Sequence, residues 1–140
     1  MSLSAALKRL PERLATGAYI LHSGLEKWNG GPEQAQGIHG MAAGAYPFLA
    51  RIEPATFLRL LAAGEIATGS LLLRPFVPRA VAGAALTAFS GGLVTMYLRT
   101  PALHKKGSVW PTPNGIAVSK DVWMLAIGTG LILDELLDED

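Results

Sequence analysis

Cysteine is absent from this 140-residue sequence, so the chain by itself forms no disulfide, no thiolate metal site and no thiol redox centre. Redox chemistry would therefore need a partner protein or a borrowed cofactor. Charge is also scarce: 16% of the residues are charged, whereas a typical soluble domain has roughly 25%. The formal net charge of +1 gives no reason to expect a nucleic acid as a partner.

The sequence also lacks the short patterns that accompany common enzyme reactions. It contains no nucleophile elbow, phosphate-binding loop, dinucleotide fingerprint or HExxH pattern. No small-residue cleavage site follows residues 1–11, so we expect a retained amphipathic lead-in rather than a signal peptide. We accordingly expect no catalytic residues, no cofactor of the chain's own and no stand-alone enzyme.

What the sequence does have is apolar length. Half of its residues are hydrophobic, and residues 80–98 form a run of nineteen without a charged side chain. That length suits a membrane-spanning helix. Small residues recur in it every four positions, a spacing that lets helix backbones approach closely in lipid. They are Gly83, Thr87, Gly91 and Thr95.

Three other segments share the character of this run, and together they predict an all-α fold: a four-helix transmembrane bundle forming a single membrane domain over residues 1–140. Prolines and charged residues bound the segments. The fourth is the shortest, with only residues 122–133 wholly uncharged before an acidic tail. The expected spans are 13–28, 55–73, 77–98 and 119–137.

The connections differ in length, and this predicts the topology. Residues 74–79 are a tight turn, so the second and third spans form an antiparallel hairpin, and the two long connections share the opposite face. We expect the first to contain an interfacial amphipathic helix interrupted near Pro47, and residues 100–118 to be irregular. The helical spacing in the first connection involves Ile38, Met41, Ala45, Phe48 or Leu49, and Ile52.

Glu65 lies in the middle of the second span, where an ionised carboxylate costs several kcal/mol unless it is paired or hydrated. It is either a proton-exchanging or ligand-binding group, or a buried hydrogen-bonding group that holds the helices in register. His22 and Glu26 lie four residues apart in the first span, with Lys27 beside them. Because the first two spans run in opposite directions, His22 and Glu65 are expected at similar depth, where they could meet. The alternative is that His22 bonds a neighbouring helix and Glu26 pairs with Lys27.

Charged residues also gather where spans end on the long-connection face. Each alone is an expected interfacial anchor; together they form a collar that could receive an anionic or quinone-like head group. His39 and His104 lie in the connections without fixed spacing to carboxylates, and we expect no metal site. The collar consists of Arg59, Arg99, Lys120 and Asp121.

These features resemble the DoxX-like family of small bacterial membrane proteins over nearly the whole chain. The resemblance is carried by residues 24–28 (GLEKW), by Glu65 followed by three leucines at 71–73, and by Lys120 and Asp121 before a leucine-rich segment. It implies a four-helix membrane bundle in the bacterial inner membrane with both termini cytoplasmic, and a link to quinone-dependent oxidase systems and redox complexes. His22, Glu26 and the His39-containing connection depart from the family pattern.

Three functions follow as hypotheses. The leading one is a subunit of a redox-linked or envelope complex, with a polar pocket of His22, Glu26, Lys27 and Glu65 that receives a quinone or lipid head group. The second is a small proton-coupled transporter in which Glu65 titrates. The third is a structural assembly factor that docks a partner helix. The expected partners are the lipid bilayer, other membrane or membrane-associated proteins and further copies of the chain.

Overall fold

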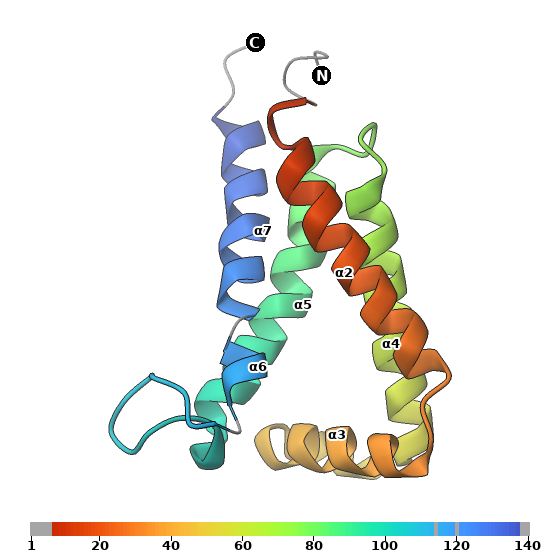
Figure 1. Cartoon of the computed structure of the whole chain (residues 1–140), viewed down its shortest axis with the longest axis vertical. Helices are drawn as coiled ribbons and strands as arrows, with labels where there is room; N and C mark the ends of the chain where they lie inside the picture. Colours follow the sequence, from red (N-terminus) through yellow and green to blue (C-terminus); the bar gives the residue numbers. More distant parts are fainter. Residues whose placement is uncertain (1–6, 114, 120, 138–140) are drawn as a thin grey trace.

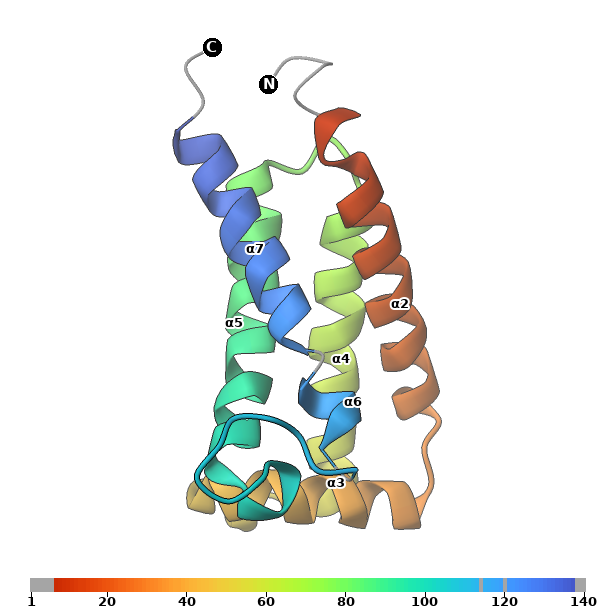
Figure 2. The same cartoon turned by 60° about the vertical axis from the view of Figure 1, so that its left-hand side comes forward.

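The structure, a computed structural model, describes residues 7–113, 115–119 and 121–137, and that part of the chain is helical without a β-strand. An isolated β-bridge joins His104 and Pro111. Four long helices run side by side, and one helix lies across an end of the bundle (Figures 1 and 2). The long helices are α2 (Leu10–Trp28), α4 (Pro54–Leu73), α5 (Arg79–Arg99) and α7 (Asp121–Leu136), and the crossing helix is α3 (Pro32–Ala45). The short elements are η1 (Pro47–Arg51), η2 (Pro101–Leu103) and α6 (Ile116–Ser119).

The all-α prediction is confirmed, and the four expected segments coincide with the four long helices to within three residues at each end. Proline stands in the first turn of α2, α3 and α4 and at the N-cap of α5, where its missing N–H costs no helical hydrogen bond. Within the described residues, α4 and α5 are the helices long and apolar enough to cross a membrane. Charged residues lower the hydropathy of α2, and α7 has only 16 residues.

The two ends of the bundle differ, as the connection lengths predict. The start of α2, the α4–α5 turn and the end of α7 lie at one end, which we call the turn end. At the other end, called the α3 end, lie α3, η1 and the irregular segment after α5 (Figure 1). The interruption of the first connection near Pro47 is also confirmed, because α3 ends at Ala45 and η1 begins at Pro47.

The long helices pack as two pairs, α2 with α4 and α5 with α7. Glycines bring the backbones together in each pair. A Cβ atom at Gly69 would lie 2.8 Å from the Gly17 carbonyl oxygen, and one at Gly83 would lie 2.7 Å from that of Gly128. Such approaches exclude any side chain, as in the small-residue contacts of membrane helices. The small-residue face of α5 is therefore used near the turn end, whereas Thr95, nearer the α3 end, is exposed.

Arg13 ties α2 to the end of α4 and to the turn before α5, at the turn end. Its side chain is buried, and its guanidinium donates four hydrogen bonds of 2.9–3.0 Å to main-chain carbonyl oxygens. The acceptors are Leu71 and Leu72 in the last turn of α4, Arg74 and Val77. The last four carbonyls of a helix lack partners within it, so Arg13 of α2 satisfies the end of α4 and fixes the turn into α5.

Acidic residues of α7 complete the closure of this end. Asp134 accepts hydrogen bonds from Arg9 and Arg79, and the Ala80 N–H donates to Glu135 Oε2 at 2.6 Å. The hydrogen bond to Asp134 raises the pKa of the Arg9 guanidinium. A carboxylate at the first turn of α5 also suits the positive end of the helix dipole. The expected acidic tail thus begins with residues that hold α7 to α5 and α2.

Replacing Arg13 with methionine should destabilise the fold by on the order of 3 kcal/mol, because several buried carbonyls lose their donor together. The measurement is the unfolding midpoint of the detergent-purified protein, followed by circular dichroism. Arg74→Met removes an exposed guanidinium from the same end and should shift the midpoint little. Equal shifts for the two variants would contradict the role assigned to Arg13.

Candidate functional site

A cavity of about 410 Å³ lies between the two helix pairs, toward the α3 end. Six helices contribute to it, and most of the lining is apolar. The apolar lining residues are Ile20, Ile38, Met41, Leu61, Phe89, Leu93, Met96, Val118 and Met124. Polar groups also line the wall: Tyr19, Ser23, Lys27, Glu65 and Asp121. We call this space the central cavity. Its size and lining, apolar with a few polar groups, are those of a ligand-binding pocket.

Lys27 and Glu65 form an ion pair on the wall of the central cavity. The Lys27 Nζ lies 3.0 Å from Glu65 Oε1 and donates to Ser23 Oγ at 2.6 Å. The Glu65 side chain is 4% exposed and that of Lys27 is 19% exposed. The pair joins α2 to α4 across the contact at Gly24, where a Cβ atom would lie 3.0 Å from Glu65 Cβ. Each charge is thereby compensated by the other, as burial of either requires.

Asp121 stands on the opposite wall, at the first residue of α7. Its side chain is buried, with 8% of the residue exposed, and it interacts electrostatically with both Glu65 and Lys27. Among the described residues, no donor within hydrogen-bond distance of its carboxylate is found. The central cavity therefore has two carboxylates and one ammonium on its wall.

His22 and Glu26 do not join this group. They pair with each other across one helical turn, His22 Nε2 to Glu26 Oε1 at 3.1 Å, and their side chains are 73% and 67% exposed. The expected meeting of His22 with Glu65 is thus replaced by the Lys27–Glu65 pair. The alternative in which Glu26 pairs with Lys27 is not found either. The reason is helical phase: α2 packs through Gly17, Ile20 and Gly24, and His22 lies on the other side of the helix.

The members of the expected charge collar have separate surroundings. Arg59 stacks over Trp28, with its guanidinium carbon 5.4 Å from the ring centre. Arg99 donates to the Ala45 carbonyl oxygen at 3.2 Å and lies over Tyr46. Asp121 faces the central cavity, so it is deeper than expected. Lys120 lies outside the described residues.

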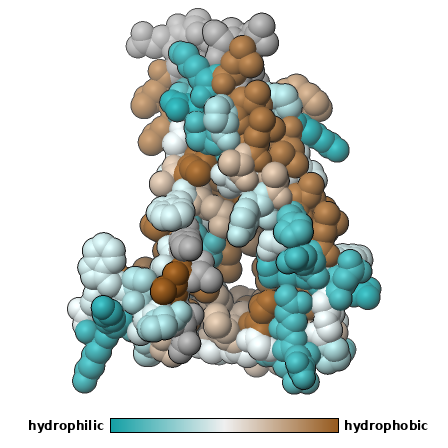
Figure 3. Space-filling model, in the orientation of Figure 1, coloured by the Kyte–Doolittle hydropathy of each residue, from teal (hydrophilic) through white to brown (hydrophobic). Residues whose placement is uncertain are grey.

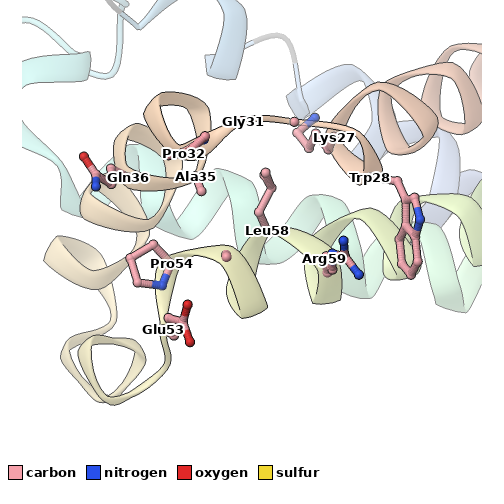
Figure 4. A pocket seen from close by; sticks show the side chains of 12 residues that line it. Lys27, Trp28, Gly31, Pro32, Ala35, Gln36, Glu53, Pro54, Leu58 and Arg59 are labelled. Atoms are coloured by element: carbon pink, nitrogen blue, oxygen red, sulfur yellow. The ribbon is translucent and has the colours of Figure 1, made fainter.

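A second pocket, of about 390 Å³, opens beside the connection between α2 and α3 (Figure 4). Trp28 and Arg59 lie side by side at one edge of it, and Glu53 and Gln36 lie toward the other (Figure 4). Lys27 lines this pocket as well as the central cavity. Lys27 therefore stands between a surface pocket and the interior of the bundle.

The two connection histidines have structural partners. His39 Nε2 donates to the Leu49 carbonyl oxygen at 2.8 Å, and its ring meets Phe57 edge-on. The ring of His104 packs against that of Tyr97, whose hydroxyl donates to the Val109 carbonyl oxygen at 2.6 Å. These contacts fix η1 beside α3 and fold the segment after α5 back on itself.

Two charged residues have larger roles than the sequence suggests. In the sequence, Arg13 is distinguished only by its place at the start of the first expected span, and Asp121 only by its place among the charged residues at the span ends. The period of small residues in α2 contains the missing signal for Arg13, because Arg13, Gly17 and Gly24 share one face. The depth of Asp121 depends on where α7 begins relative to α5, and the sequence gives no measure of that.

Comparison with known proteins points to a membrane protein. A protein-family model described as DoxX matches residues 9–98, which is more than half of the chain. The match contains α2 to α5, including Lys27 and Glu65, and ends before Asp121. No curated protein and no solved structure matches the chain.

Removing one partner of the Lys27–Glu65 pair should cost more stability than removing both. Lys27→Met leaves a buried carboxylate and Glu65→Leu leaves a half-buried ammonium, each at a cost of about 3 kcal/mol, whereas the double variant restores most of the loss. Unfolding midpoints of the four proteins provide the coupling energy. Glu26→Gln, which changes an exposed charge on the same helix, should be close to neutral. A coupling energy near zero would contradict the stabilising interaction assigned to the pair.

Proposed function

The chain belongs to the DoxX family, and from this premise we propose that it is a multi-pass protein of the bacterial inner membrane whose four long helices all span the bilayer. Membership and the two apolar helices point to a membrane protein. The further step, to four spans, is supported by exposed leucines on the outer faces of the other two helices, Leu14 and Leu25 on α2 and Leu133 on α7.

The surface supports the same arrangement. Hydrophobic residues run along the side of the bundle, whereas hydrophilic residues gather at the α3 end, with a further group near the turn end (Figure 3). Exposed tryptophans stand at or beyond helix ends: Trp28 is the last residue of α2, Trp123 lies in the first turn of α7, and Trp110 lies in the segment between α5 and α6. Aromatic residues of this kind favour the membrane–water interface. We place α3 in the plane of that interface.

Because the chain has no cysteine, single introduced cysteines test this topology directly. Lys8→Cys and Phe76→Cys mark the turn end, and Gln36→Cys and Lys106→Cys mark the α3 end. With a membrane-impermeant maleimide added to spheroplasts, we expect the α3-end pair to be labelled and the turn-end pair to be labelled only after lysis. The unmodified chain is the blank. Labelling of Phe76→Cys and Gln36→Cys from the same side would contradict the proposal that α4, the long helix between these two positions, crosses the bilayer.

We further propose that the protein is a non-catalytic subunit of a redox-linked or envelope complex and that the central cavity receives the head group of a lipid-soluble molecule, a quinone or a lipid. The single observation that carries this is the cavity itself. It lies inside the bundle, its walls are apolar, and its charges are confined to Lys27, Glu65 and Asp121. A buried charged group inside a membrane bundle is costly, and such residues are usually retained for a function. Binding a polar head group would be such a function.

Purification from mildly solubilised membranes, with mass spectrometry of bound lipids, quinones and proteins, tests this function. Leu61→Trp fills the central cavity, and Leu60→Trp places the same bulk on the exposed side of α4. We expect a bound lipophile in the wild type and in Leu60→Trp, reduced by about tenfold in Leu61→Trp. Equal amounts in all three proteins would mean that the molecule binds elsewhere. Absence of any co-purifying redox or envelope protein would remove the complex from the proposal.

A further inference from the structure

We propose that the central cavity binds an amphiphile with an alkylammonium head group, held at Asp121, and that the alkyl chain passes out between α2 and α7. This rests on the proposed function, in which the cavity receives a head group, and it selects among the possible ligands by charge. The observations are the charge balance on the cavity wall, the lack of a donor at Asp121 and a groove that continues the cavity to the outside of the bundle.

The charge balance favours a cation. Lys27, Glu65 and Asp121 are the charged residues lining the cavity, and Lys27 lies within bonding distance of Glu65. In the described part of the chain no side chain or backbone N–H donates a hydrogen bond to the Asp121 carboxylate, although the residue is more than nine-tenths buried. A buried carboxylate requires a hydrogen-bond donor or a counter-charge. An ammonium group supplies both.

The apolar wall suits the rest of such a molecule. Met41, Met96 and Met124 offer flexible, polarisable surfaces that adapt to an alkyl chain. The aromatic rings of Tyr19 and Phe89 also line the cavity, and aromatic faces attract ammonium groups. The wall therefore combines an acidic anchor with surfaces that accept both parts of a cationic amphiphile.

A groove of about 500 Å³ between α2 and α7 continues the cavity outward. Tyr19, Asp121 and Met124 line both spaces and so form the boundary between them. The outer groove has Trp123 and Ile127 on α7 and Ala15 and Thr16 on α2. A head group at Asp121 can therefore keep its chain on the lipid-facing side, and exchange with the bilayer needs no passage through water.

Other head groups suit the site less well. An anionic head would face two carboxylates, with the one ammonium already paired. An oxidised quinone only accepts hydrogen bonds, and Lys27 already directs donors at Glu65 and Ser23. A hydroxyl head group can also donate a hydrogen bond to the Asp121 carboxylate, but an ammonium head adds the positive charge that compensates it.

Three ligands with the same chain test the inference by isothermal titration calorimetry at pH 7: decylammonium, decanol and decanoate. The protein is held in lipid nanodiscs, and heats from empty nanodiscs are subtracted. In the wild type, decylammonium should bind at least about tenfold more tightly than decanol, and decanoate more weakly still. This ordering needs no variant, so it stands even if a substitution disturbs folding.

The variants then assign the preference to one residue. Asp121→Asn should weaken decylammonium binding by about tenfold and change decanol binding by less than about twofold. Glu26→Gln removes an exposed carboxylate of the same charge and should bind like the wild type. Equal affinities for the three ligands, or an ammonium preference that survives Asp121→Asn, would overturn the inference while leaving the amphiphile cavity of the proposed function in place. Binding of none of them to the wild type would overturn both.

Discussion

The fold depends on one buried guanidinium. Arg13 reaches from α2 to the end of α4 and to the turn that leads into α5, and it satisfies four carbonyl oxygens at once. Glycine contacts hold each helix pair together internally, but they act within α2–α4 and within α5–α7. Arg13, with the Asp134 and Glu135 contacts beside it, joins the two pairs at the turn end. Because that end is fixed, the pairs are able to diverge toward the α3 end.

Divergence requires something to fill or cover the widening space, and α3 does part of this. Its buried alanines pack with Met96 of α5 and with η1, while the hydroxyl of Tyr46 donates to the Gly92 carbonyl oxygen at 2.8 Å. The remaining space is the central cavity. An ion pair and a third buried charge on its wall contribute little net stability, since apolar side chains of similar volume would pack as well or better. Their presence is therefore better explained by binding than by folding.

The sequence predicts most of the helices, because prolines and charges bound apolar segments of the right length. It also places Glu65 correctly inside the bundle. It misplaces His22, because an interval of four residues shows that His22 and Glu26 share a face without showing which face is buried. The glycines at 17 and 24 identify that face, since only the packed side needs glycine, and Lys27 follows Gly24 by three residues. The period of small residues in α2 therefore also indicates that Lys27 is the partner of Glu65.

Asp121 is different, because no local pattern sets its depth. It follows α6, a short helix of four residues, and α7 begins part of the way along α5 rather than at its end. The height at which one helix ends and the next begins, relative to a neighbouring helix, depends on tertiary packing. Here it depends on the contact of Gly128 with Gly83 and Thr87. That contact fixes the register of α7 against α5 and hence the height of Asp121 in the bundle. The small-residue face thereby connects to the chemistry of the cavity, since it positions a carboxylate in front of the Lys27–Glu65 pair.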